Sequence, residues 1–537
     1  MNLLDNEDID KLLITIEEST RSTKQGVKYF LEPARGTLSR VTSKRHHLVF
    51  GRRGSGKSSL LEKAVTELTT SRRPIAKVDL EGFKGHQYPD VLISVLIRTF
   101  NEFERWLNTA AISPRNKWSL WRIFGRKPDS PPLNKRLAAA SALQLRVASN
   151  DLEKLLHADD DVKTEVEVCA EDSTLTREKD SIEINAEVVA VELGSENTAS
   201  TRDKRRVKQE SVKTKVSQLH RNILRYQDIF RGIAELSDGD SFLLLDDLYH
   251  IRRSDQPSVL DFFHRIAKGN GLWIKAGTIK HRTDWYTHGD PPIGMKIGDD
   301  ADIVDLDLTL DQYDQAKKFL LNILQRFCDD AGVDVKAILA DGARDRLVLA
   351  SGGVARDFLS IFRKSVEVAR ERGGGSRGEK VGIEDVNIAS GAHDTSKQEE
   401  FKRDTLGDQS LLQEEYRRVN EFCVRKKANC FLVDIKNEEP DRVAFLDELV
   451  DLKLLHLVRS RVTVGGDEKY TGRTFKAYML DLSQYTGTRK LRDLQIIEFW
   501  KTASANQLRR SSIIYLSPVL TGMSNRNLGA KGEKDEF

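Results

Sequence analysis

Short apolar runs alternate with amphipathic stretches along much of this chain. Residues 46–50 (HHLVF) and 74–83 (PIAKVDLEGF) are compact apolar runs typical of buried strands, and residues 58–68 and 88–107 follow them with apolar positions at helical spacing. Further strand-like runs stand in 241–251 (SFLLLDDLYHI), 271–286 and 300–308. Strands that alternate with helices predict an α/β core built on a parallel sheet.

Residues 111–215 interrupt this alternation. Within them, 133–158 has the pattern of a helix, and 162–168 (VKTEVEV) and 181–193 (SIEINAEVVAVEL) alternate with period two and suggest a β-hairpin. Residues 200–215 (STRDKRRVKQESVKTK) are highly charged and are interpreted as a link. We therefore expect an α+β insertion in the core.

The C-terminal third follows a different order. Residues 309–397 are helical in pattern, whereas 398–487 read as helix, strand, helix and two strands around a glycine turn at Gly465-Gly466, which is the order of a winged helix. The last residues are polar with little periodicity, and we expect them to be loose. The expected division is a lead at 1–29, a core at 30–308, a helical lid at 309–397, a winged-helix domain at 398–487 and a tail at 488–537.

Composition narrows the class of protein. A chain of 537 residues is too long for a single hydrophobic core, so we expect several domains. The apolar fraction of 39% is enough for packed domains. A net charge of +3 does not indicate nucleic-acid binding by overall charge, so any basic patch must be local. Four cysteines without a CxxC pair argue against disulfides and zinc. We see no signal peptide and no apolar run of about 18 residues, so the expected location is cytoplasmic, with no membrane span.

The stretch GRRGSGKSS follows the first strand and opens the first helix, which is the context of a phosphate-binding loop. Its glycines permit a backbone path whose N–H groups face phosphate oxygens, and the following helix adds its positive end. Lys57 would bridge the β- and γ-phosphates, and Ser58 would bind Mg²⁺. Chance occurrence of these residues in a surface loop is the alternative. The expected ATP-binding residues are Gly51, Gly54, Ser55, Gly56, Lys57, Ser58 and Ser59.

A second acidic site is expected at the end of a buried strand. SFLLLDDLYH places Asp246 and Asp247 directly after four apolar residues. Asp246 would hold Mg²⁺ through water, and Asp247 would polarise the attacking water. Taken alone, the pattern also fits a buried strand with an acidic helix cap; the phosphate loop upstream favours the functional interpretation.

With these motifs the chain resembles the additional-strand P-loop ATPases of the AAA+ or STAND kind, and within them the origin-recognition initiators that carry a winged helix. The resemblance covers about 30–110 and 216–390, and more weakly 398–487. It implies that Thr278, at the end of KAGT, senses the γ-phosphate, and that Arg356, in SGGVARDFL, is a second sensor on the lid. An ordinary exposed helix arginine is the alternative for Arg356.

The chain also departs from that family. Its acidic pair is Asp-Asp instead of Asp-Glu, and the shorter side chain predicts slow turnover. The insertion is not part of the initiator pattern. The arginine finger is left open among Arg252, Arg253, Arg265 and Arg282.

The winged-helix region suggests a partner. Its second helix carries acidic residues that would repel DNA phosphates: Asp441, Asp447, Glu448 and Asp451. Basic residues around the glycine turn would instead contact double-stranded DNA: Arg459, Arg461, Lys469, Arg473 and Lys476. A winged helix that binds protein is the alternative.

The insertion mixes Trp118, Trp121 and Phe124 with basic residues, which suits a nucleic-acid groove or a membrane surface; aromatic side chains packed on the core are the plainer interpretation.

Two functions follow. The first is an oligomeric ATPase whose nucleotide state drives assembly or a conformational switch together with DNA. The second is a slow ATP-dependent signalling or defence sensor that binds proteins, for instance a separate effector. A small-molecule kinase is the weakest alternative, because such enzymes rarely need a helical lid and a winged helix.

Overall fold

The computed structural model describes most of the chain. The described residues are 4–19, 26–70, 73–112, 133–158, 161–170, 205–237, 239–373, 379–404, 409–435, 440–464, 470, 472–486, 496–501, 507–510 and 513–515. Backbone proximity divides the chain into two units. The first comprises residues 1–70, 244–257 and 275–537, and the second comprises 71–243 and 258–274.

A five-stranded sheet forms the centre of the α/β fold. Its strands are β1 (His46–Phe50), β2 (Ile75–Asp79), β5 (Ser241–Asp246), β6 (Leu272–Thr278) and β9 (Ala301–Asp305). Their order is β2-β5-β6-β1-β9, and β1 runs parallel to both β6 and β9. One additional strand, β6, thus separates the strand before the phosphate loop from the strand that ends in Asp246. The predicted fold class, a P-loop parallel sheet of the additional-strand type, is confirmed.

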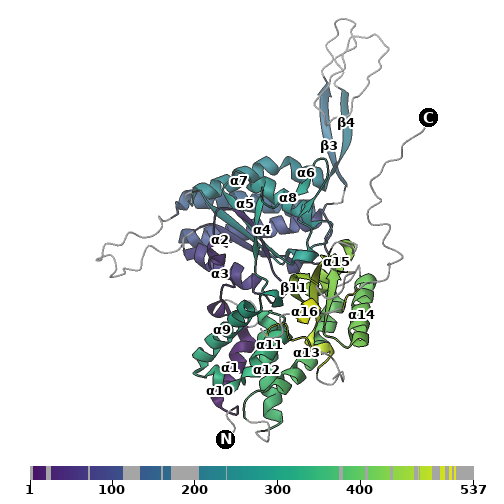
Figure 1. Cartoon of the computed structure of the whole chain (residues 1–537). Helices are drawn as coiled ribbons and strands as arrows, with labels where there is room; N and C mark the ends of the chain where they lie inside the picture. Colours follow the sequence, from purple (N-terminus) through teal and green to yellow (C-terminus); the bar gives the residue numbers. More distant parts are fainter. Residues whose placement is uncertain are drawn as a thin grey trace, which may run out of the picture. The chain divides into compact units, whose positions relative to one another are not determined.

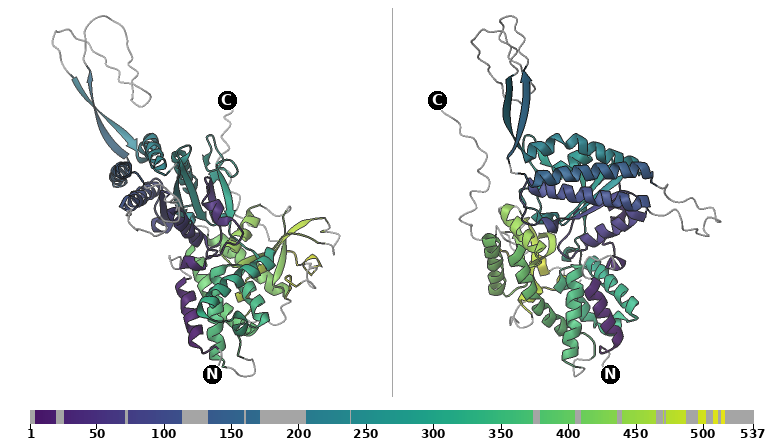
Figure 2. Two further views of the ribbon diagram at one scale, coloured as in Figure 1. Left: turned by 90° about the vertical axis from the view of Figure 1, so that its left-hand side faces the viewer. Right: turned by 180° about the vertical axis from the view of Figure 1, so that it is seen from behind.

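Helices in the second unit form their own core. Its principal helices are α4 (Asp90–Ile112), α5 (Lys135–Leu156) and α7 (Ile223–Glu235). Figure 2 shows α4 and α5 side by side, and Phe100 packs against Tyr226 and Phe230 of α7. Asn134 caps α5 because its side chain accepts from the N–H of Arg136.

The insertion contains a strand where the sequence suggests a link. Strand β3 (Asp161–Ala170) pairs antiparallel with β4 (Arg205–Thr214), whereas the hairpin partner expected at 181–193 lies outside the described residues. The interpretation of 200–215 as a link is therefore wrong from Arg205 onward. A backbone ladder does not need apolar side chains, and it pairs Glu167 in register with Lys208.

The lid is a helical bundle that also holds the N-terminal segment. Its helices are α9 (Tyr313–Ala331), α11 (Asp341–Ser351), α12 (Ala355–Glu371) and α13 (Ile383–Asp404). Helix α1 (Glu7–Ser19) lies beside α9 and α12 (Figure 1). It buries Ile9, Leu12, Leu13 and Ile16, which are spaced to share one helix face. The lead thus contributes to the lid.

The winged-helix region contains α14 (Gln409–Lys426), β10 (Cys430–Asp434), α15 (Pro440–Asp451), β11 (Leu455–Thr463) and β12 (Thr474–Leu480). Its three strands form an antiparallel sheet in the order β10-β12-β11. Part of the tail, at 496–501, 507–510 and 513–515, packs on it, whereas the end of the chain, where looseness was expected, lies outside the described residues. Ile497 and Phe499 are buried, and the Tyr515 hydroxyl donates to Glu415 at 3.0 Å. Isolated apolar and aromatic residues without periodicity are enough for this packing.

Apart from the helices α3 and α8, the remaining elements are short. They are α2 (Thr37–Val41), α3 (Lys57–Thr70), α6 (Lys215–Arg221), α8 (Gln256–Ala267), α10 (Val335–Ile338), α16 (Gln507–Arg510), β7 (Tyr286–Thr287), β8 (Ile293–Gly294) and the 3-10 helices η1 (Gly26–Tyr29), η2 (Leu80–Phe83), η4 (Leu248–His250), η5 (Lys280–Arg282), η6 (Leu310–Gln312) and η8 (Leu482–Gln484). Within the described ranges, no helix combines the length and apolar character needed to cross a membrane.

Candidate nucleotide-binding site

The loop between β1 and α3 has the backbone that its glycines predict. Gly54 and Gly56 adopt positive φ values of 91° and 100°, a region that favours glycine. A Cβ on Gly54 would lie 2.8 Å from the Cβ of Arg356, and one on Gly51 would lie 2.3 Å from Ser55 Oγ. Glycine is therefore required here for both conformation and space.

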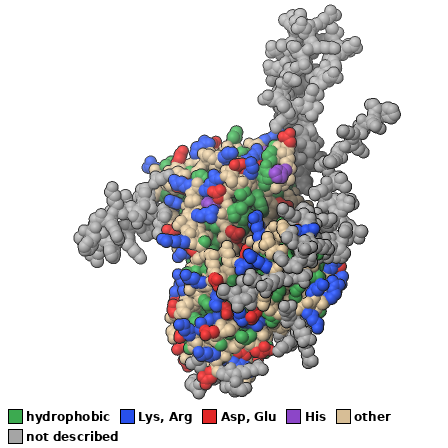
Figure 3. All heavy atoms as spheres, in the orientation of Figure 1, with side chains coloured by type: hydrophobic (Ala, Val, Ile, Leu, Met, Phe, Trp, Pro, Cys, Tyr) green, Lys and Arg blue, Asp and Glu red, His purple; other side chains and the backbone are tan. Residues whose placement is uncertain are grey.

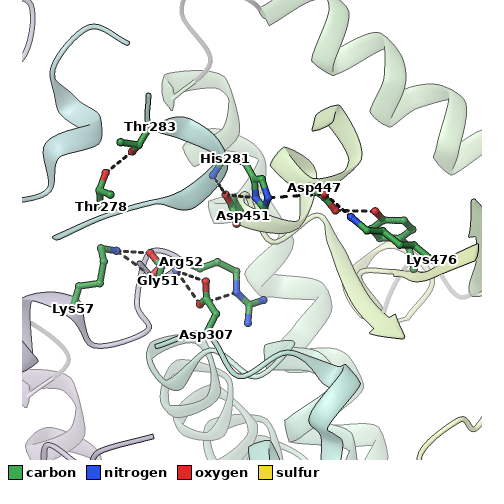
Figure 4. A network of polar contacts seen from close by, with 11 residues as sticks. Gly51, Arg52, Lys57, Thr278, His281, Thr283, Asp307, Asp447, Asp451 and Lys476 are labelled. Atoms are coloured by element: carbon green, nitrogen blue, oxygen red, sulfur yellow. Dashed lines mark hydrogen bonds and ion pairs between the residues drawn. The ribbon is translucent and has the colours of Figure 1, made fainter. Parts of the chain in front are cut away.

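Lys57 is the first residue of α3, and its ammonium is turned onto the loop. Its Nζ donates to the carbonyl oxygens of Gly51 at 2.7 Å and Arg52 at 3.2 Å (Figure 4). Burial lowers the pKa of this amine, and the charges of Asp247, Asp307 and Asp246 oppose that effect. A buried cation among carboxylates and loop N–H groups suits a phosphate chain.

Hydroxyl groups of the loop complete the set of possible phosphate and metal contacts. Ser55 Oγ is buried and has no hydrogen-bond partner within the described part of the chain. Ser58 and Ser59 lie in the first turn of α3 and are partly exposed. The hydroxyl of Ser55 is thus available to a ligand.

The acidic pair lies where β5 ends. Asp246 is buried, and its Oδ1 lies 3.2 Å from the position that a Cβ of Gly277 would take on the neighbouring strand. Asp247 follows with φ 56° and ψ 48°, a left-handed conformation that is uncommon for a residue other than glycine. Backbone strain of this kind gathers at functional sites, and it turns the chain sharply after the strand.

Thr278 ends β6 beside the loop. Its carbonyl oxygen accepts from the N–H of Gly51 at 3.1 Å, and its hydroxyl bonds that of Thr283. Both threonines are buried. The structure therefore places Thr278 next to the phosphate loop, with its hydroxyl held by Thr283.

Arg356 reaches the loop from the lid. It is the second residue of α12, and its backbone N–H donates to the Gly54 carbonyl at 3.2 Å. Its charge acts on Lys57, whose pKa it lowers. The structure therefore brings together Arg356, the loop and the acidic pair.

Sequence reasoning missed two residues of this site. Arg52 is buried, and its backbone N–H donates to both oxygens of Asp307, at 2.9 and 3.1 Å. Its side chain donates to Asp307 through Nε and to the carbonyls of Leu308 and Gly352 through Nη2. An arginine directly after the first glycine of the loop was the only signal in the sequence.

The arginine-finger candidates have different surroundings. Arg282 lies over the ring of Tyr249 at 5.7 Å, and Lys57 Nζ lies over the same ring at 5.8 Å. Arg253 pairs with Asp284 and Arg265 with Asp261, whereas Arg252 is exposed. Arg282 thus shares the Tyr249 ring with Lys57 of the phosphate loop.

The expected DNA contacts are largely engaged by carboxylates. Arg459 bonds Asp311, Arg473 bonds Asp434 at 3.3 Å, and Lys476 bonds Asp447 at 2.7 Å. Arg461 is exposed, and Lys469 lies outside the described residues. On the face drawn in Figure 3, basic and acidic side chains are interspersed. The aromatic and basic segment around Trp118 also lies outside the described residues.

The acidic helix α15 faces the end of β6. The backbone N–H and Nδ1 of His281 both contact Asp451 Oδ2, at 2.9 and 3.0 Å (Figure 4). Burial would lower the pKa of His281, but its hydrogen bond to Asp451 and the nearby Asp447 charge raise it. These carboxylates therefore tie the winged helix to the strand that carries Thr278.

Together the sheet order, the loop and the acidic pair define an additional-strand P-loop fold with a nucleotide-type site. No protein-family model and no curated protein matches the chain. Among solved structures, the Aeropyrum pernix ORC1 protein in complex with DNA is similar over 86% of this chain and 92% of that chain, with 12% identity and a TM-score of 0.33.

The Aeropyrum pernix ORC2 protein, in ADPNP-ADP complexes, is similar over 84% of this chain and 90% of that chain, with 9% identity and a TM-score of 0.29. At such TM-scores neither likeness carries the assignment. The assignment of the fold rests on strand order and the loop.

Proposed function

We propose that this protein binds and hydrolyses ATP with Mg²⁺, and that the bound nucleotide controls how the lid and the winged helix are held. The observation that supports this proposal most strongly is the position of Lys57. Its ammonium donates to the loop carbonyls and is acted on by the charges of three carboxylates, with Arg356 of the lid beside the loop. A γ-phosphate placed there would compete with the loop carbonyls for the ammonium group.

The residues present fit a magnesium ion. Ser58 and Asp246 offer a hydroxyl and a carboxylate, the hard oxygen ligands that Mg²⁺ prefers together with substrate phosphates. The described residues contain no group of three His, Cys, Asp or Glu side chains that could hold a metal without substrate. When bound, Mg²⁺ would neutralise charge on the phosphates.

The protein's own residues then account for hydrolysis. Asp247 polarises a water whose oxygen attacks the γ-phosphorus, while the bond to the bridging oxygen breaks and ADP leaves. Lys57 and Arg356 stabilise the negative charge that spreads over the transferred group. Aspartate reaches less far than glutamate, so we expect slow turnover.

Buried ion pairs support the proposal that the bound nucleotide controls how the winged helix is held. Lys453, beside α15, bonds Asp357 of the lid at 3.3 Å, and Lys397 bonds Asp481 at 2.7 Å. Burial would raise the pKa of Asp357, but the charge of Lys453 lowers it, so this carboxylate is ionised. Asp357 directly follows Arg356, and a shift of Arg356 toward phosphate would therefore act on the winged helix.

The test of nucleotide binding is titration of ATP into the wild-type protein and the Lys57→Ala variant. Wild type is expected to bind, and the variant to lose at least tenfold in affinity, because the phosphate chain loses its central cation. Equal affinity of the two proteins would overturn the site.

A protein partner is favoured over DNA by a specific observation. Three of the five expected DNA contacts already bond carboxylates, which reduces their attraction for phosphate. We therefore infer that the winged helix presents a protein-binding surface, with DNA as the second candidate. Turnover measured with and without double-stranded DNA, at low and physiological salt, tests this: stimulation that fades with salt would establish DNA instead.

A further inference from the structure

Arg52 is one of the most deeply buried side chains of the molecule, with only 1% of its surface exposed. A buried guanidinium is costly unless it is paired and its N–H groups are bonded. Asp307 supplies the charge, and the carbonyls of Leu308 and Gly352 accept from Nη2 at 3.1 and 3.0 Å. These contacts join the phosphate loop to the exit of β9 and to the turn before α12.

That turn has no room to move independently. A Cβ on Gly353 would lie 2.0 Å from the carbonyl oxygen of Leu308, and one on Gly352 would lie 2.1 Å from His456 Nδ1. Helix α12 starts at Ala355, so Arg356 lies only four residues beyond Gly352. The position of Gly352 therefore determines where Arg356 enters the site.

Arg52 also lies next to the group that phosphate must displace. Lys57 Nζ donates to the carbonyls of Gly51 and Arg52, the two peptide units around the arginine. Transfer of that ammonium to a phosphate would release both carbonyls. Arg52 thus contacts Lys57 through its backbone carbonyl (Figure 4). It contacts Gly352 of the lid through its side chain.

We propose that Arg52 is a positioning residue that holds the turn before Arg356 against the phosphate loop, and so makes the lid respond to the γ-phosphate. The inference rests on the proposed ATPase function. Arg52 touches neither nucleotide nor water in this account; it acts through Gly352 and Arg356.

The test compares Arg52→Lys, Arg356→Ala and the double variant in ATP turnover and in the ratio of ATP to ADP affinity. Lysine keeps the charge beside Asp307 but lacks the planar fork that reaches two carbonyls. We expect the affinity of Arg52→Lys for ADP to stay within about threefold of wild type, and turnover and the ATP-to-ADP ratio to fall about tenfold, a loss typical of a displaced catalytic group. The double variant should be no worse than Arg356→Ala, because both act through one arginine.

Arg45→Lys is the matched control. Arg45 pairs with Asp302 of β9 at 3.1 Å and donates to the carbonyl of Gly298, at the other end of β1. Its substitution should leave turnover unchanged. If Arg52→Lys does not fold, Arg52→Gln replaces it in the same comparison.

Three results would overturn the inference. They are wild-type turnover in a folded Arg52 variant, additive losses in the double variant, and loss of all nucleotide binding in Arg52→Lys, which would make the residue a scaffold of the loop alone. If wild type itself does not bind ATP, the proposed function fails instead.

Discussion

The close approach of Gly54 to Arg356 shows how single residues determine this site. The loop glycine has positive φ, and no Cβ fits between it and the lid arginine. Asp247 likewise holds a left-handed backbone directly after the buried Asp246. Gly54 and Asp247 thus hold uncommon backbone conformations at the point where charged groups come together.

Gly54→Ala should therefore abolish nucleotide binding while the rest of the protein stays folded. The new methyl group meets the Cβ of Arg356 and forces the loop off its path, in addition to about 1–2 kcal/mol of backbone strain. Gly85→Ala is the control, since Gly85 has the same φ of 91° with nothing within 4 Å of its missing Cβ. ATP titration of both variants checks this. If Gly54→Ala bound ATP as Gly85→Ala does, the close contact would have no importance.

At the scale of elements, the lid and the winged helix are joined by buried charges. Lys453 beside α15 and Asp357 of the lid are both almost fully buried. A separate ion pair, between His281 and Asp451, links η5 after β6 to α15. Removing one partner of a buried ion pair lowers protein stability strongly, because the other charge stays buried without a compensating charge.

Lys453→Met is expected to lower the free energy of unfolding by about 3 kcal/mol, because it removes the cation with the largest effect on the buried Asp357 carboxylate and leaves only His393 and the charge of Lys397 near it. Lys364→Met is the matched control: Lys364 pairs with Glu367 on the surface, where such a pair contributes about 0–1 kcal/mol. Denaturant unfolding of the two variants measures the difference. Equal losses would show that Asp357 does not depend on Lys453.

His281 should make the attachment of α15 depend on pH. The pKa of His281 is raised in the folded protein above its value of about 6.5 in an unfolded chain. Its stabilising contribution is therefore complete at pH values below about 6.5, and it is lost as the pH rises through the folded pKa. Wild type should therefore exceed His281→Gln in stability by about 1 kcal/mol near pH 6. That difference should shrink toward pH 9, and a difference that grew with pH would contradict the raised pKa.

At the scale of the whole molecule, much of the α/β core could be predicted from the sequence, because buried strands and amphipathic helices leave periodic patterns. The loop, Asp246 and Asp247 could be predicted because phosphate chemistry requires those residue types at that spacing. Arg52 and Asp307 could not, since their role depends on a contact between segments 255 residues apart. Charged β4 also left no apolar pattern.

Release of inorganic phosphate from Mg²⁺–ATP, measured for the wild-type protein and for Asp247→Asn, tests whether this site is an ATPase. We expect slow but measurable release by wild type. We expect that Asp247→Asn binds ATP with similar affinity and releases phosphate at least a hundredfold more slowly, because the amide cannot accept a proton from water. Equal release by the two proteins, or none by a wild-type protein that binds ATP, would contradict the assignment of this site as an ATPase.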